Sequence, residues 1–138
     1  MAKTAFAFLD HQTTSEGIFW PVGNEGWYPR GEEKALYDQQ PVEAVTMAEA
    51  AMAAFNLLGD EEYLAAFRRA HGWFHGQNSQ KESLVDVLSG ACCDGLLESG
   101  VNRNQGAEST LAYLWTEFCN QNVLCALADS LKITVASA

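Results

Sequence analysis

An alanine-rich apolar stretch, VEAVTMAEAAMAAFNLL at residues 42–58, constrains the fold of this chain more than any other feature. Its apolar residues cover nearly the whole helical circumference, which is typical of a helix that is buried on most sides. Pro41 precedes the stretch and suits the first helical position, because the backbone N–H that proline lacks has no partner there. Gly59 follows and favours the left-handed exit of a helix. The sequence therefore predicts a buried inner helix over residues 41–58.

A second helix is predicted directly after Gly59, with Asp60 as its N-terminal cap. Two glutamates follow in the first turn, where the helix dipole favours anions. The apolar side chains that recur at spacings of three and four are Tyr63, Leu64, Phe67, Ala70, Trp73 and Phe74. With Arg68 and Arg69 on the other side, this pattern predicts an amphipathic outer helix that ends near Gly76. The inner and outer helices together make an antiparallel αα-hairpin.

A third helix, again apolar over most of its surface, is predicted from Gly106 to about Leu131. The residues that open it, QGAES at 105–109, match QPVEA at 40–44. A match at the starts of two buried helices is typical of a helical-hairpin repeat, in which each unit covers the apolar face of its neighbour. We therefore expect a mainly α fold of antiparallel helical hairpins, forming a single domain over residues 1–138.

The segments outside these helices carry further expectations. Residues 1–9 are predicted to be the last turns of a helix. Residues 23–26 (GNEG) form a turn-rich quartet between aromatic runs, which predicts a short β-hairpin or an extended aromatic loop near the N-terminus. Residues 77–104 form a long polar connection, and loops of that length are usually functional or mobile. Within this connection we expect a turn of helix around residues 83–88.

The charge of the chain excludes several classes of partner. The formal net charge is −10 and the pI is ≈ 4.5, a balance that repels nucleic acid and anionic membranes and favours a neutral or cationic small ligand. No stretch approaches the ~20 apolar residues that a membrane helix needs, and the start of the chain lacks a secretory-signal pattern. The cysteines have no zinc-site spacing and are expected to be reduced thiols of a cytoplasmic protein. They are Cys92, Cys93, Cys119 and Cys125.

Five segments together resemble a known family: residues 8–10 (FLD), 21–28 (PVGNEGWY), 38–44 (DQQPVEA), 93–96 (CDGL) and 100–110 (GVNRNQGAEST). This succession is similar to the C-terminal part of bacterial six-hairpin (α/α)6 toroid domains, which are often fused to or encoded beside glycosyltransferases. Toroids of this class are usually glycosidases, sugar epimerases or sugar-binding relatives. The resemblance implies a pocket at the end of the toroid where the inner helices begin, and a glycosyltransferase as partner.

The length of the chain corresponds to about two of the six hairpins, so the resemblance implies a partial toroid. An incomplete ring leaves apolar surface of the inner helices uncovered, and large exposed apolar patches normally mark an interface. We therefore expect a homodimer or a larger assembly of this chain.

Four carboxylates are candidates for chemistry at the implied pocket. Glu43 and Glu108 lie in the first turns of the two buried helices, and Asp38 and Asp94 lie upstream in loops. Glycoside hydrolysis needs two carboxyl groups flanking the bond, and carboxyls beside apolar walls can separate into an acid and a base. Structural alternatives remain open. Each glutamate occupies the third helical position, where it can cap the helix start, Asp94 suits a turn, and Asp38 suits loop hydrogen bonding.

Amide and aromatic side chains are expected to bind a saccharide beside these carboxylates. Amides offer both a donor and an acceptor to sugar hydroxyls, and flat rings suit the C–H surfaces of sugars. The candidates are Gln39, Gln40, Asn102, Asn104 and Gln105, with Asn24 in the turn and the aromatic residues Trp20, Trp27 and Tyr28. The alternative is a rigid loop network held by hydrogen bonds between side chains and backbone.

His71 and His75 are four residues apart on the second helix and could face one ion together. Gly72 stands where the glutamate of a metalloprotease helix motif would be, and no acidic third ligand lies in register. Solvated or aromatic-packed histidines are therefore expected, with no metal and no cofactor.

These expectations converge on a carbohydrate-associated domain, glycosidase-like or epimerase-like, that acts with a glycosyltransferase. The alternative is a non-catalytic sugar-binding or assembly module. The partial ring favours this alternative, because at least half the usual wall of the pocket is missing unless a partner supplies it.

Overall fold

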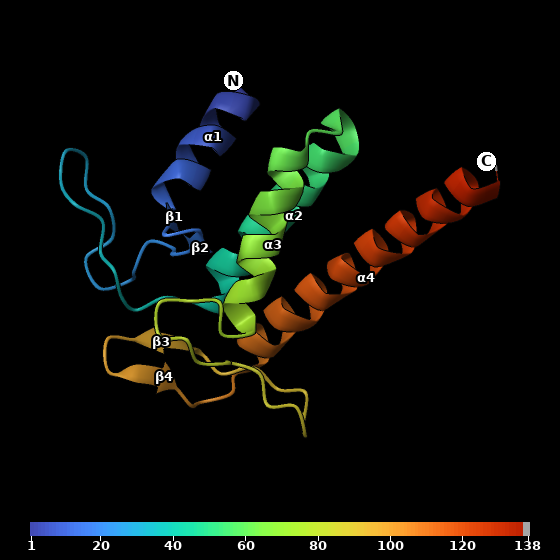
Figure 1. Cartoon of the computed structure of the whole chain (residues 1–138). Coiled ribbons are helices and arrows are strands. Elements are labelled where there is room, and N and C mark those ends of the chain that lie inside the picture. Colours follow the sequence, from blue (N-terminus) through green and yellow to red (C-terminus); the bar gives the residue numbers. More distant parts are fainter. Residues whose placement is uncertain (137–138) are drawn as a thin grey trace.

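The chain folds into a mainly helical structure with two small antiparallel β-hairpins (Figure 1). The computed structural model describes the backbone of residues 1–136 and the side chains of residues 1–125. The elements of this described part are α1 (Ala2–Gln12), β1 (Thr14–Ser15), β2 (Ile18–Phe19), α2 (Pro41–Leu58), α3 (Glu61–Phe74), β3 (Gly95–Leu97), β4 (Gly100–Asn102) and α4 (Ala107–Ala136). The mainly α class expected from the sequence is thus observed.

The predicted αα-hairpin is present as α2 and α3, which pack side by side (Figure 1). Pro41 occupies the first turn of α2, and Gly59 ends it in the left-handed conformation with φ 75°. Asp60 takes the N-cap position of α3 with an extended backbone, but its side chain makes no capping hydrogen bond. Instead, one Asp60 carboxylate oxygen lies 3.7 Å from the Lys3 ammonium on α1.

Helix α3 is amphipathic as expected, but the expected burial of α2 on most of its sides is wrong for the described part of the chain. Helix α2 buries a single stripe, formed by Pro41, Ala44, Met47, Ala48 and Ala51, and its other side is exposed. Helix α3 buries more side chains, including the large residues Leu64, Phe67, Trp73 and Phe74. An all-apolar circumference predicts burial only if something covers each side, and here α3 and α4 cover one side of α2.

The core lies between α2, α3 and the connection that follows α3. Trp73, Phe67 and Phe74 are 0–1% exposed and pack with Leu84 and Leu96 from the connection. The helical turn expected around residues 83–88 is absent from this described segment. Asp86 accepts hydrogen bonds from the Leu88 N–H and the Ser89 hydroxyl, and these bonds stabilise a tight turn in place of a helix.

The predicted N-terminal hairpin exists, but its turn lies at Glu16 and Gly17 and not at residues 23–26. Thr14 pairs with Phe19 and Ser15 with Ile18. The two turn residues have positive φ angles of 51° and 80°, which is the two-residue turn whose twist suits a hairpin.

Residues 23–26 begin a long loop that returns along itself before α2 and projects from one side of the molecule (Figure 1). The Gly23 N–H donates to the Ala35 carbonyl at 2.7 Å, and the Ala35 N–H donates to the Trp27 carbonyl at 2.8 Å. A Cβ atom at Gly23 would lie 2.1 Å from the Tyr37 carbonyl oxygen, so only glycine fits this crossing.

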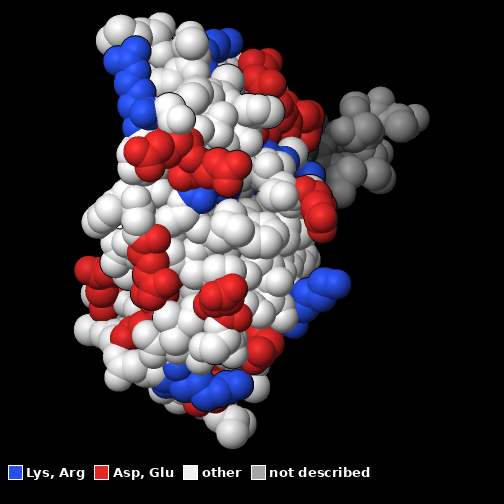
Figure 2. Space-filling view, turned by 90° about the vertical axis from the view of Figure 1, so that its left-hand side faces the viewer, with Lys and Arg blue, Asp and Glu red and all other residues white. Residues whose placement is uncertain are grey.

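Helix α4 begins beside the start of α2 and diverges from α2 and α3 toward the C-terminus (Figure 1). Within the described residues, none of the helices combines the length and the apolar character needed to cross a membrane. Figure 2 shows carboxylates scattered over the face that carries α1, with Lys and Arg in small separate groups. This distribution agrees with the acidic composition.

Candidate functional site

The starts of α2 and α4 line one open hollow of about 380 Å³. Two backbone hydrogen bonds of 2.9 Å between Gln39 and Leu96 join the segment before α2 to β3. Strand β4 then leads through a short segment into α4, so the hairpin places the two helix starts together. Five of the residues that the sequence predicts for the site line this hollow. They are Asp38, Gln40, Asp94, Asn102 and Glu108.

Asp94 accepts the hydrogen bonds that hold the start of α4 in place. One carboxylate oxygen, Oδ1, accepts from the Gly106 N–H at 2.7 Å and from the Ser109 hydroxyl at 2.6 Å. The other oxygen accepts from the side-chain amide of Asn104. A Cβ at Gly106 would lie 2.8 Å from Oδ1, so glycine permits this approach. The hydrogen bond from Ser109, followed by those from Asn104 and Gly106, holds the Asp94 pKa below its usual value against the opposing effect of burial.

These bonds give Asp94 the capping role that the sequence suggested for Glu108 as an alternative to catalysis. The Glu108 carboxylate is exposed and accepts no hydrogen bond from any described residue, and Asp94 is bonded to donors at the helix start. The sequence suggested a turn at Asp94 and Gly95, but Gly95 is the first residue of strand β3. The structure thus leaves Glu108 free to face solvent in the hollow.

Asp38 differs from Asp94 because part of its carboxylate has no partner. Its Oδ1 atom is buried and makes no hydrogen bond within the described chain. A Cβ at Gly95 would lie 3.1 Å from this oxygen and 2.2 Å from the Gln39 carbonyl, so glycine allows the two segments to meet. A buried carboxylate oxygen without a donor is costly. Asp38 also lines the hollow, so a ligand hydroxyl that bonds to its carboxylate there would be favourable.

Gln39 is a core residue, which corrects its predicted role as a ligand contact. It is 0% exposed, and its Oε1 accepts from the Trp73 indole N–H at 2.9 Å. Its amide nitrogen donates to the Leu36 carbonyl at 3.0 Å and to the Ser79 hydroxyl at 2.9 Å. The side chain therefore has no group left for a ligand, and this part of the loop is the rigid network that the sequence left as the alternative.

Glu43 faces a separate and smaller hollow of about 190 Å³ with largely apolar walls, including Phe19, Pro21 and Met47. Burial raises the Glu43 pKa to about 7, although the Gln40 backbone N–H and the charge of Lys34 lower it and the charge of Asp38 raises it further. The Oε2 atom is buried without a hydrogen-bond partner among the described residues.

The aromatic candidates lie in the N-terminal loop and do not line the hollow at the helix starts. Trp20 is half-buried, and its indole N–H donates to the Leu36 carbonyl at 3.2 Å. Tyr28 donates from its hydroxyl to the Gln12 side chain at 3.0 Å. Trp27 is 68% exposed, and Asn24 beside it is also exposed. The structure therefore does not bring these rings to the carboxylates, because their loop leaves the body of the fold before α2 begins.

The remaining amide candidates, Asn104 and Gln105, lie outside the hollow at the helix starts. Asn104 bonds to Asp94 and serves the α4 start. Gln105 lines a neighbouring open hollow of about 410 Å³, together with Asp86, Cys93 and Arg103. Neither amide lines the hollow that holds Asp38.

No protein-family model matches this sequence, and a search of curated proteins gives no match either.

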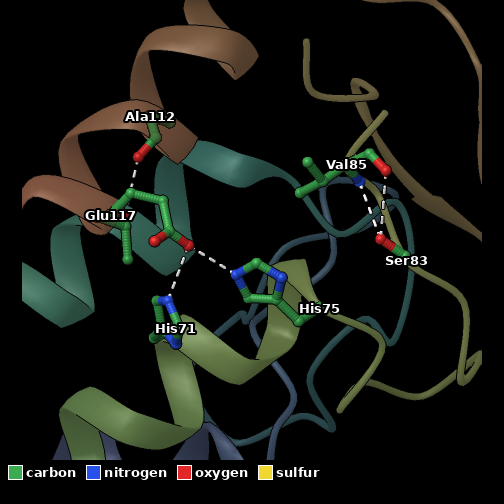
Figure 3. A network of polar contacts seen from close by, with 7 residues as sticks. His71, His75, Ser83, Val85, Ala112 and Glu117 are labelled. Carbon is green, nitrogen blue, oxygen red and sulfur yellow. Dashed lines mark hydrogen bonds and ion pairs between the residues drawn. The ribbon is translucent and has the colours of Figure 1, made fainter. Parts of the chain in front are cut away.

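One cluster of polar side chains was not predicted from the sequence. His71 on α3 and His75, the residue that directly follows α3, both contact the Glu117 carboxylate of α4 (Figure 3). The sequence offered no acidic third ligand in register with the histidines, and the structure supplies one from another helix, 42 residues after His75. Glu117 is the one charged residue between Glu108 and Asp129, and a charge within so apolar a helix needs a partner. That isolated charge was the available signal.

Proposed function

We propose that this chain is a carbohydrate-binding part of an (α/α) toroid, with its saccharide site in the hollow where α2 and α4 begin. The observation that carries the proposal is the Asp38 carboxylate, which lines this hollow and whose buried Oδ1 has no donor in the described chain. Sugars present many hydroxyl donors, and a hydroxyl bonded to this carboxylate would satisfy it. The family resemblance implies a site at the same end of the inner helices.

The other side chains of the hollow suit the same ligand. Gln40 and Asn102 offer amide donors and acceptors, and Glu108 offers a second carboxylate that is exposed. Asp94 is already bonded to three donors, so it supports the wall and leaves Asp38 and Glu108 as the acidic pair. An acidic hollow of this kind favours a neutral polyol over a phosphorylated sugar, because the net charge of −10 repels anions.

Sugar processing is a second candidate, and the protonation of Glu43 favours it. A carboxyl group with a pKa of about 7 can act as a general acid near neutral pH. Glu43 lies on the first turn of α2, and its charge couples to that of Asp38. A glycosidase-like or epimerase-like reaction would need the ligand to reach from the Asp38 hollow into the small hollow of Glu43, so binding is the better supported function.

We further propose that copies of this chain associate, and that the assembly acts with a glycosyltransferase in the cytoplasm. An apolar groove of about 590 Å³ lies between α1 and α2, and α4 exposes Leu111, Leu114, Trp115 and Phe118. Uncovered apolar surface of this kind supports an interface with a second copy. All four cysteines are free thiols, which agrees with a reducing compartment.

Isothermal titration calorimetry with neutral saccharides tests the proposal. We expect saturable binding by the wild type, loss of about tenfold or more in affinity in Asp38→Asn, and a smaller loss in Glu108→Gln. Glu98→Gln, which changes an exposed acid at the β3–β4 turn, is the matched control and should bind like the wild type. Equal binding by Asp38→Asn and the control would refute the assigned site.

Hydrolysis of aryl glycosides by wild type and Glu43→Gln separates the two candidates. Turnover that disappears in Glu43→Gln while binding persists supports sugar processing. Binding without turnover in both proteins supports the binding module.

A further inference from the structure

His71, His75 and Glu117 form a compact cluster between α3 and α4, outside the hollow at the helix starts. The His71 Nε2 lies 2.8 Å and the His75 Nε2 lies 2.7 Å from the same Glu117 oxygen, Oε1. One ligand atom from each residue lies within 4.8 Å of the other two. The side chains are 21%, 38% and 25% exposed, so the cluster is sheltered and still reachable from solvent.

The local structure explains why the two imidazoles converge. His71 lies in the last turn of α3, His75 is the residue that caps the end of that helix, and their two ring centroids are 4.7 Å apart. Phe67 stacks on the His71 ring at 6.0 Å with an interplanar angle of 17°. Tyr113, one turn before Glu117 on α4, meets the His75 ring edge-on at 5.9 Å. Aromatic packing thus limits how far either ring can turn away.

We propose that His71, His75 and Glu117 bind one divalent transition-metal ion, with zinc as the best fit. Two imidazole nitrogens and one carboxylate oxygen are a ligand set that zinc takes at open sites, where a water or a substrate fills the fourth position. Imidazole ligands favour zinc and its neighbours over magnesium and calcium, which prefer oxygen ligands throughout. This inference does not depend on the saccharide proposal, because it concerns different residues.

The observed distances suit an ion after a small adjustment. Ligand atoms that lie about 2.0–2.1 Å from a tetrahedral zinc are roughly 3.3 Å from each other. The two contacts to Glu117, now 2.7 and 2.8 Å, would therefore open by about half an ångström as the ion replaces the hydrogen bonds. Side-chain rotation is sufficient for that change, and the helices need not move.

The surroundings also set the expected strength of binding. Metal-bound imidazoles usually donate from their second nitrogen to a carboxylate or carbonyl, and such partners raise the affinity about 10–100-fold. Neither Nδ1 atom has a protein partner in the part of the chain whose side chains are described. We therefore expect a dissociation constant in the micromolar range, weaker than that of a closed structural zinc site.

The competing explanation is a purely structural one, in which two imidazoles donate hydrogen bonds to one carboxylate. The explanations differ in what Glu117→Gln does. A glutamine keeps the length and a carbonyl acceptor for the histidines, so the fold survives, but its neutral amide is a poor zinc ligand.

Calorimetric titration of the whole chain, first stripped with a chelator, with zinc chloride tests the proposal. The expected result is one zinc per chain, with affinity reduced at least ~100-fold in Glu117→Gln and in His75→Ala. His11→Ala is the matched control, because His11 is the remaining histidine and is exposed on α1. It should bind zinc like the wild type.

Cobalt(II) substitution gives a readout that does not depend on stability or activity. Bound cobalt should show the intense visible absorption of a four-coordinate ion with nitrogen and oxygen ligands, and Glu117→Gln should lack it while keeping the wild-type circular dichroism. Absence of zinc binding at millimolar concentration would overturn the proposal. Binding that is unchanged in Glu117→Gln, or lost in His11→Ala, would overturn it equally.

Discussion

Substitution of Asp94 by asparagine tests the hydrogen-bond cluster that positions the start of α4. The carboxylate accepts from the Gly106 N–H and the Ser109 hydroxyl on one oxygen and from the Asn104 amide on the other. An asparagine has only one acceptor oxygen, so its NH₂ group must face at least one of these donors. Loss of a helix cap costs ~0.5–2 kcal/mol, and hydrogen bonds to a charged group contribute ~1.5–3 kcal/mol. Because Asp94 is partly exposed, we expect Asp94→Asn to lower the free energy of unfolding by about 2 kcal/mol, near the low end of the sum of these two contributions.

Urea unfolding followed by circular dichroism measures this loss at pH 7, with Glu98→Gln as the control for removal of one negative charge from the same hairpin. The control should stay within ~0.5 kcal/mol of the wild type, since its side chain is exposed and makes no hydrogen bond to a described residue.

The pH dependence of the Asp94→Asn effect has a definite sign. The pKa of Asp94 is lower in the folded state, where Ser109, Asn104 and Gly106 donate to it, than in the unfolded chain. Its contribution is therefore complete above the unfolded value of ~3.9 and is lost as the pH falls through the folded pKa. The difference between wild type and variant should shrink below about pH 4. A difference of less than ~0.5 kcal/mol at pH 7, or one that grows in acid, would refute the reasoning.

Three further predictions concern the burial of side chains. Gln39→Leu leaves the Trp73 indole N–H buried without its acceptor and should lower the free energy of unfolding by ~2–3 kcal/mol in the same urea assay. The ¹³C chemical shift of the Glu43 carboxyl should titrate near pH 7. Because the pKa is raised in the folded state, the free energy of unfolding relative to Glu43→Gln should fall as the pH rises from about 4.3 to 7. A titration midpoint of the ¹³C shift near pH 4.3 would contradict the burial of this carboxyl. Cys125 is exposed and should react promptly with a disulfide reagent at pH 8, whereas burial raises the Cys92 pKa to about 12 and should delay its reaction until unfolding.

The helix boundaries were largely predictable because their signals are local. Pro41 and Gly59 delimit α2 in the structure as they do in the sequence pattern, and Asp60 takes the N-cap position of α3. Burial was less predictable, because the alanine-rich composition of α2 does not say how many neighbours cover it. The β3–β4 hairpin was missed, since its strands have three residues each and lie within a long polar segment.

The candidate site shows the same limit. The QPVEA and QGAES match places the two helix starts at corresponding positions, and the structure has both starts at one hollow. Side-chain direction was beyond the pattern, so Glu43 faces a second hollow and Gln39 enters the core. Glu117 could not be paired with His71 and His75 from sequence, because the register between α3 and α4 depends on packing of residues far apart in the chain.

Chemical-shift mapping of the ¹⁵N-labelled chain with glucose, mannose, galactose, N-acetylglucosamine, maltose and cellobiose is the most direct measurement of where a saccharide binds. We predict saturable shifts at the backbone amides of Gln40, Asn102 and Glu108 with at least one of these sugars, and their disappearance in Asp38→Asn. Saturable shifts confined to other parts of the fold, or no saturable shift with any sugar, would contradict a saccharide site at the starts of α2 and α4.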